Sequence, residues 1–251
     1  MKVLFLGWDV GAWNCDRNRE SRDALCVLEE RNGSPVVAGK PWRGNVRDLL
    51  VSHEGNALVD ALLQLVAVDA RGGHLVSIAI DTPLAWPRRT VDLLSAGTVV
   101  NVPSEADRNP YLFREQELAL FTNKYRPLSV VRDMIGSQST KGIHFLQKAQ
   151  LTRVGTGVWR NQTVVAIETY PACAIRDIGV RRLTSELMSD LLEQENQQRS
   201  VAWQNDVRDA ITCALVAWLH RRWPGRLKPP GNGADAEEGW IWLPSSAMAC
   251  A

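Results

Sequence analysis

The sequence predicts a mixed α/β fold, in which a five-stranded sheet is flanked by helices and a large insertion separates the fourth strand from the fifth. Short, wholly apolar runs bounded by turn residues indicate buried strands, and longer segments with apolar residues every three or four positions indicate helices. Their order is three strands, a helix, a strand, the insertion, a strand and two helices. This order favours one domain over the 251 residues, with a mixed sheet.

The first half of the chain contains four predicted strands and one helix. Residues 3–6 (VLFL) form a short apolar run, which is typical of a buried central strand. Residues 24–30 and 35–39 flank an Asn-Gly turn, so the first three strands are expected to form an antiparallel meander. Residues 56–70 have helical spacing and end at two glycines, and a further buried strand follows at 75–80.

The second half begins with a segment that has no clean period, from about residue 85 to 162. A segment of this length between strands is typical of a functional insertion. It contains one helix candidate, at 112–121. The fifth strand, two long helices and a short edge strand are then predicted at 164–168, 185–198, 203–222 and 239–244.

Composition excludes several classes of protein. Apolar residues make up 45% and charged residues 23% of the chain, which excludes a disordered or fibrous protein. The five cysteines are odd in number and show no CxxC spacing, which argues against a disulfide framework or a zinc site and for a reducing compartment. No apolar run approaches the roughly 20 residues that span a bilayer. We therefore expect a cytoplasmic protein without a membrane partner.

The net charge of +1 hides an asymmetry along the chain. Residues 82–162 hold 11 Lys and Arg against 6 Asp and Glu, while the remainder holds 18 against 22. A basic segment beside an acidic remainder is compatible with an acidic site next to an anion-binding surface. Within the basic segment, Arg126 and Lys141 are the predicted substrate-binding residues, because cations in such a segment can follow a phosphate backbone.

Five acids form the candidate catalytic set. Three apolar strands end in a carboxylate, at Asp9, Asp81 and Glu168. Asp206 and Asp209 are three residues apart on the last helix and therefore lie on one face. Converging carboxylates indicate a hard divalent ion, because Mg²⁺ and Mn²⁺ prefer oxygen ligands. Two such ions can activate a water molecule and stabilise the leaving oxygen of a phosphodiester.

These motifs resemble a known superfamily. GWDVG around Asp9, IDTP around Asp81, ETYPA from Glu168, DVRDA from Asp206 and the late GWIWLP segment are together similar to the ribonuclease H-like superfamily. More narrowly, they resemble its predicted nucleases of domain of unknown function 429. The resemblance implies a metal-dependent nuclease acting on DNA or RNA, with Mg²⁺ or Mn²⁺ held by Asp9, Asp81, Asp206 and Asp209. It implies that Glu168 is a further ligand or a partner of one.

Two other functions fit parts of the sequence. Asp9-Val10-Gly11 matches the opening hairpin of sugar-kinase and actin-type phosphotransferases, which use ATP. The residues that follow contain no hydroxyl where those proteins place Ser or Thr, and the sequence has no glycine-rich adenosine loop. A non-catalytic nucleic-acid-binding protein is the other alternative, and it predicts negligible affinity for metal ions.

Overall fold

A mixed seven-stranded sheet forms the centre of the protein, in the order β3-β2-β1-β4-β7-β6-β5. The computed structural model describes residues 2–70, 73–105, 108–120, 127–195 and 199–248. The strands are β1 (Lys2–Asp9), β2 (Asp23–Arg31), β3 (Ser34–Gly44), β4 (His74–Asp81), β5 (Thr152–Gly155), β6 (Val158–Arg160) and β7 (Val164–Glu168). The three central strands, β1, β4 and β7, are parallel, and the strands on either side are antiparallel.

The prediction of five strands is wrong, because the sheet has seven. The five predicted strands are present, and the two additional ones form a hairpin at the end of the insertion. β5 has four residues, all exposed, and β6 has three. Strands this short, without buried residues at alternate positions, lack the apolar alternation by which a strand is recognised in a sequence.

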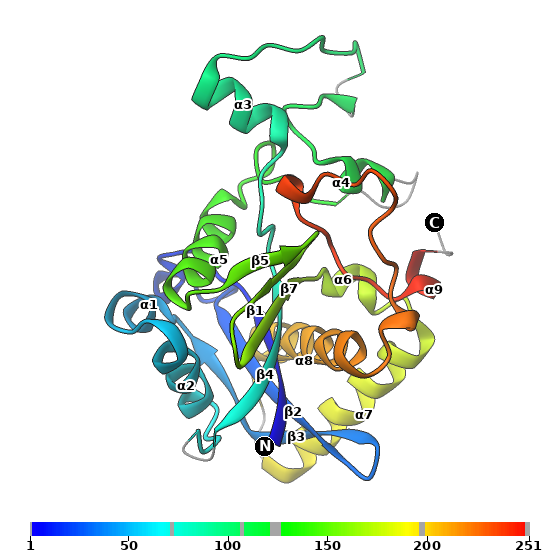
Figure 1. The fold of residues 1–251 in the computed structure, drawn as a ribbon. Helices are drawn as coiled ribbons and strands as arrows, with labels where there is room; N and C mark the ends of the chain where they lie inside the picture. Colours follow the sequence, from blue (N-terminus) through cyan, green and yellow to red (C-terminus); the bar gives the residue numbers. More distant parts are fainter. Residues whose placement is uncertain (1, 71–72, 106–107, 121–126, 196–198, 249–251) are drawn as a thin grey trace.

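Helices cover both faces of the sheet (Figure 1). One face packs against α1 (Arg47–Ser52), α2 (Gly55–Leu65) and α5 (Gly136–Lys148), and the other against α6 (Pro171–Ala174), α7 (Ile178–Glu195) and α8 (Val201–Arg222). The remaining helices are α3 (Arg88–Ala96), α4 (Glu115–Ala119) and α9 (Ser245–Met248). Figure 1 shows α3 and the chain after it projecting from the body. Within the described residues, no helix is long and apolar enough to cross a membrane.

Several predicted elements differ in extent from the observed ones. α2 ends at Leu65, and α7 begins at Ile178, earlier than its apolar spacing indicates. The sequence pattern predicts neither α3 nor α5, and α5 begins with Gly and Ser, which are poor helix formers. In place of an edge strand, residues 239–244 form two isolated bridges, Glu168 with Ile241 and Leu227 with Pro244.

Alternation along β1 determines which way its terminal acid points. Leu4, Leu6 and Trp8 pack in the cluster that includes α2 and α5, whereas Phe5 packs in the cluster that includes α8. Successive side chains of a strand point to opposite faces. Asp9 shares its parity with Phe5 and therefore lies on the α8 face.

The backbone of α8 lies directly against β1 at Gly7. A Cβ atom at Gly7 would be 1.8 Å from the carbonyl oxygen of Ala210 and 2.4 Å from the backbone nitrogen of Ala214. Only glycine on the strand and small residues on the helix permit this approach. It places the N-terminal half of α8 over the carboxyl ends of β1 and β4.

We predict that Gly7→Ala destabilises the fold by about 3 kcal/mol or more, because the added methyl group overlaps backbone atoms that cannot rotate away. Urea denaturation measures the change in the free energy of unfolding. Gly231→Ala is the matched control, since a Cβ atom there meets no atom within 4 Å. Equal stabilities of the two variants would contradict the close packing of α8 on β1.

Candidate metal centre and adjoining pocket

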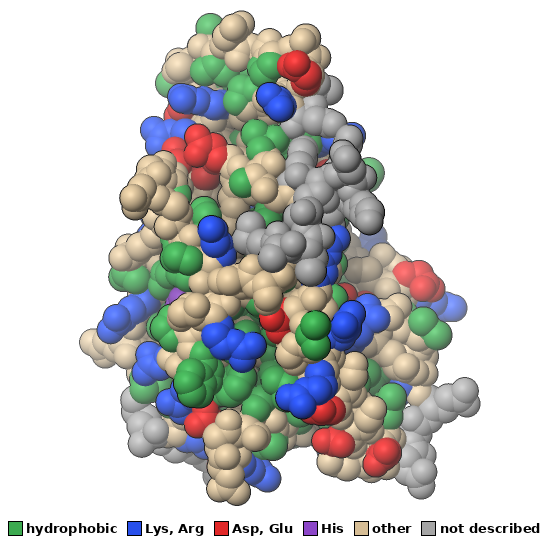
Figure 2. Space-filling view, turned by 90° about the vertical axis from the view of Figure 1, so that its right-hand side faces the viewer, with side chains coloured by type: hydrophobic (Ala, Val, Ile, Leu, Met, Phe, Trp, Pro, Cys, Tyr) green, Lys and Arg blue, Asp and Glu red, His purple; other side chains and the backbone are tan. Residues whose placement is uncertain are grey.

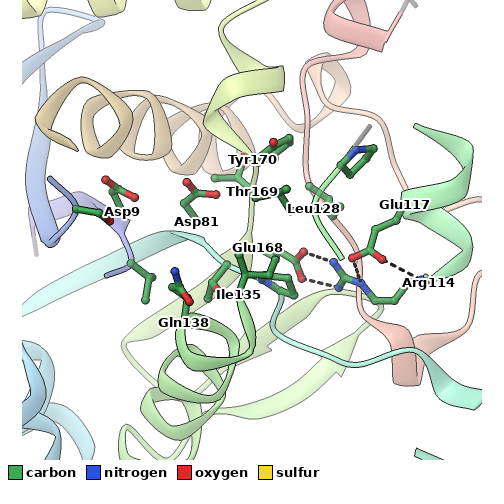
Figure 3. Close-up of a pocket in the computed structure, with 16 residues that line it drawn as sticks. Asp9, Asp81, Arg114, Glu117, Leu128, Ile135, Gln138, Glu168, Thr169 and Tyr170 are labelled. Atoms are coloured by element: carbon green, nitrogen blue, oxygen red, sulfur yellow. Dashed lines mark hydrogen bonds and ion pairs between the residues drawn. The ribbon is translucent and has the colours of Figure 1, made fainter. Parts of the chain in front are cut away.

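Asp9 and Asp81 lie side by side at the carboxyl ends of adjacent parallel strands. They are direct partners in the register of β1 and β4. Paired residues of neighbouring parallel strands point to the same face, and neighbouring strands are about 4.8 Å apart. Figure 3 shows the two carboxylates next to one another. Among the described residues, neither carboxylate forms an ion pair with a cationic side chain.

Burial and mutual repulsion act on this pair. The pKa of Asp9 is raised well above its usual value by burial first, and then by the negative charges of Asp81, Asp209 and Asp206. The pKa of Asp81 is raised by burial, and then by Asp209 and Glu168. The carboxylates of Asp9, Asp81 and α8 therefore influence one another electrostatically.

The two α8 acids have different partners. The Arg43 guanidinium lies 2.6 Å from Asp206 Oδ2, which also accepts a hydrogen bond from the backbone nitrogen of Arg22 at 3.2 Å. Burial raises the pKa of Asp209, and Arg208, 3.3 Å away, only partly offsets that effect. The negative charge of Asp206 is therefore balanced by Arg43. The charge of Asp209 is less fully balanced, so Asp209 is the α8 carboxylate that could bind a cation together with Asp9 and Asp81.

Glu168 points to the other face of the sheet. It pairs in register with Ile80 and shares its parity with Val164 and Ala166, which pack on the α2 and α5 side. Its two oxygens form a bidentate ion pair with Arg114, at 2.5 and 2.8 Å, and accept a hydrogen bond from the backbone nitrogen of Leu84 at 2.9 Å.

Arg114 is a structural cation within the basic segment. It is 1% exposed and also bonds Glu117, 2.8 Å away, and the carbonyl oxygen of Glu238. Glu168 therefore belongs to a buried cluster with Arg114 and Glu117. It lines the same pocket as Asp9 and Asp81, but its carboxylate is bonded to Arg114. Among the described residues, no three His, Cys, Asp or Glu side chains stand close enough together to hold an ion as they are.

Lys141 is buried, not at the surface. Its side chain is 0% exposed, and its ammonium group forms an ion pair with Asp23 and bonds Asn45 Oδ1 at 3.0 Å and the carbonyl oxygens of Gly11 and Ala12 at 3.3 Å. It is not placed to contact a nucleic acid. The other predicted substrate-binding residue, Arg126, lies outside the described residues.

Sequence reasoning missed Asp23, the partner of Lys141. Asp23 is fully buried and also accepts hydrogen bonds from the Trp8 indole and from the backbone nitrogens of Gly11 and Val46. The available signal was an acid directly before the apolar run of β2, but nothing in the sequence indicates that a lysine 118 residues away faces it.

Much of the basic excess of residues 82–162 is neutralised within the protein. Besides Arg114 and Lys141, four described cations of this segment form ion pairs: Arg88 and Arg89 with Asp92, Lys148 with Glu54, and Arg153 with Glu237. Figure 2 shows Lys and Arg side chains scattered among acidic and polar ones on the face in view.

A pocket of about 190 Å³ opens beside the acid pair. Asp9, Asp81 and Thr82 line one side, and Arg114, Glu117 and Glu168 line another. Its remaining walls come mainly from Gln138 and Ile135, from Tyr170, and from Leu128 (Figure 3). The cavity therefore has a side with unpaired acids, a side with ion-paired charges, and walls that are largely apolar.

Comparison with models of protein families, with curated proteins and with solved structures finds no match for this chain.

We predict that Lys141→Met destabilises the protein by about 3–5 kcal/mol, because it leaves the buried Asp23 carboxylate without its cation. Chemical denaturation measures the loss. Lys148→Met is the matched control on the same helix: its ion pair with Glu54 is partly exposed, so a change of about 0–1 kcal/mol is expected. A stable Lys141→Met variant would contradict the structural assignment of this lysine.

We also predict that Asp9→Asn stabilises the metal-free protein at pH 7. The raised pKa means that the folded protein binds this proton more tightly than the unfolded chain, so ionisation of Asp9 costs stability increasingly as the pH rises above the ordinary aspartate value of about 3.9. The advantage of the variant should therefore vanish near pH 3. Thermal melts of chelator-treated protein across this range measure it.

Asp16→Asn is the control of opposite sign. A hydrogen bond from Asn45 lowers the pKa of Asp16, so this carboxylate stabilises the fold above its unfolded pKa, and the contribution is lost as the pH falls. The substitution should slightly lower stability at pH 7 and have no effect near pH 3. An Asp9→Asn variant with the same pH trend as Asp16→Asn would contradict the repulsive cluster.

Proposed function

We propose that the protein is a metal-dependent nuclease that hydrolyses phosphodiester bonds. The proposal rests on one observation: Asp9, Asp81 and Asp209 form a cluster of mutually repelling carboxylates beside a pocket, and their charges are poorly compensated. Natural folds rarely keep such groups together unless a cation or a reaction uses them.

The donor set fits a hard divalent ion, Mg²⁺ or Mn²⁺, because all the available groups are carboxylate oxygens. Asp9, Asp81 and Asp209 would hold it, and their side chains would have to rotate toward one another to do so. When bound, the ion supplies activation of a water molecule and neutralisation of charge on the phosphodiester. Asp206, bonded to Arg43, and Glu168, bonded to Arg114, would stiffen the surroundings of the site.

The sheet order adds support. The run β3-β2-β1-β4-β7, with a helix connection between β3 and β4 and α8 lying on β1, agrees with the ribonuclease H-like arrangement that the sequence motifs imply. In this arrangement the first strand, the fourth strand and a late helix each contribute an acid. Fold alone does not determine activity, so the acid cluster is the stronger argument.

The phosphotransferase alternative receives no support from the first turn. Binding of ATP there would use backbone N–H groups to hold phosphate oxygens. The N–H of Gly11 already donates to Asp23 at 2.8 Å, and the N–H of Trp13 donates to Ser137 at 3.0 Å. The non-catalytic alternative would leave the repulsive acid cluster without a purpose.

Titration calorimetry with Mn²⁺ tests the proposal and separates the two α8 acids. Asp9→Asn and Asp209→Asn should each weaken Mn²⁺ binding at least about 10-fold, the lower end of what losing the partner of a metal ligand costs. Asp206→Asn should weaken it less and should lower the melting temperature more, because it breaks the ion pair with Arg43.

Activity is measured in parallel with Mn²⁺ on single-stranded DNA and RNA and on bis(p-nitrophenyl) phosphate. Hydrolysis should require the metal and should be lost in Asp9→Asn. Negligible Mn²⁺ affinity of the unsubstituted protein would overturn the proposal and favour the non-catalytic alternative. A stronger loss of metal binding in Asp206→Asn than in Asp209→Asn would reverse the roles assigned to these two acids.

A further inference from the structure

We infer that the pocket beside the acid cluster binds the base of a single unpaired nucleotide. This inference deepens the proposed nuclease function and rests on it, because it places a nucleotide next to the groups that would act on its phosphate. The pocket is lined by Asp9 and Asp81 at one side, so a ring bound inside it would have its sugar and phosphate beside those carboxylates.

Two polar atoms at the pocket have no partner. Thr82 Oγ1 and Gln138 Oε1 are buried without a hydrogen-bond partner among the described residues, although both side chains line the cavity. Thr82 is only 4% exposed. Buried polar atoms are nearly always hydrogen-bonded, because an unmade bond costs free energy. Neither atom is accessible from the cavity as the side chains stand, so a ligand with donors and acceptors at the edge of a ring would satisfy both only after the Thr82 and Gln138 side chains rotate toward it.

Neighbouring contacts hold together the two segments that carry these side chains, the chain after β4 and helix α5. The methyl group of Thr82 packs at Gly142 of α5, where even a Cβ atom would be 2.5 Å from it. The hydroxyl of Ser139 donates to the carbonyl oxygen of Pro83 at 2.8 Å and accepts from the Trp86 indole at 3.1 Å, which ties α5 to the chain after β4. Gln138 precedes Ser139 on this anchored helix, and its side chain lies near Asp9 and Asp81 in Figure 3.

The other walls suit the flat faces of a base. Leu128, Ile135 and Ile241 supply apolar surface, and Tyr170 supplies an aromatic ring. Burial, followed by the charge of Asp81, raises the pKa of Tyr170 to about 12, so its ring stays neutral at physiological pH. Bases stack on aromatic side chains, and an amide side chain pairs with the edge of a base.

The size of the pocket limits the ligand to one ring system. Its volume of about 190 Å³ is below the roughly 300–1,000 Å³ typical of sites that enclose drug-sized ligands. A base inside a duplex cannot enter such a cavity without leaving the stack. The inferred substrate is therefore a strand with an unpaired nucleotide, single-stranded or locally opened, rather than an intact duplex.

Titration of the metal-free protein with the four common nucleosides, and with ribose as the matched probe that lacks a base, tests the inference. At least one nucleoside should bind about 10-fold more tightly than ribose, as expected for one stacked and hydrogen-bonded base. Gln138→Leu should reduce that preference to threefold or less, roughly the effect of losing one or two hydrogen bonds. Thr82→Val, which keeps the shape of the side chain, should also reduce it.

Gln147→Leu is the control, since it makes the same chemical change on α5 at a residue that does not line this pocket. The Gln147→Leu variant should bind the preferred nucleoside over ribose as strongly as the unsubstituted protein does. Melting temperatures of all variants verify that they are folded. Equal binding of nucleosides and ribose, or an unchanged preference in a folded Gln138→Leu protein, would overturn the inference. Mn²⁺ titration of the same preparations tests the metal site separately, so each proposal can fail without the other.

Discussion

The contact between Gly7 of β1 and the backbone of α8 is the constraint on which the site depends. Because a strand residue without a side chain meets Ala210 and Ala214, the helix axis approaches the sheet more closely than ordinary side chains permit. Asp209 directly precedes Ala210, so the same approach brings its carboxylate toward Asp9 and Asp81. A larger residue at this crossing would lift α8 and open the acid cluster.

The protein treats its buried charges in two ways. Lys141 with Asp23, and Arg114 with Glu117 and Glu168, are closed sets in which each charge has a partner of opposite sign and further hydrogen bonds. Such sets join distant segments and are costly to break on one side only. The carboxylates of Asp9 and Asp81 repel each other instead, and the fold does not relieve that repulsion. This difference separates structural acids from the candidate functional ones.

The ion pairs inside the protein also change how a substrate is expected to be recognised. The excess of Lys and Arg in residues 82–162 suggested a surface that follows a phosphate backbone. Lys141 and Arg114, however, are buried and form ion pairs with acids inside the protein. Beside the acids lies a small pocket, and two of its lining side chains carry buried polar atoms without a hydrogen-bond partner among the described residues. The proposed binding of an unpaired base in this pocket would not require an extended basic surface.

The sequence by itself determined the five main strands, the two long late helices and the acids at the ends of β1 and β4, because apolar period and strand-end position are local properties. It did not determine the β5–β6 hairpin, whose strands are too short and exposed to show a period. Only the tertiary structure separated Glu168 and Asp206 from Asp209, since the parity of β7 and the positions of Arg114 and Arg43 decide which carboxylates are compensated. Lys141 was predicted to bind substrate, but the structure places it in the core. The sequence could not show this, because its partner Asp23 is adjacent to it only in the folded chain.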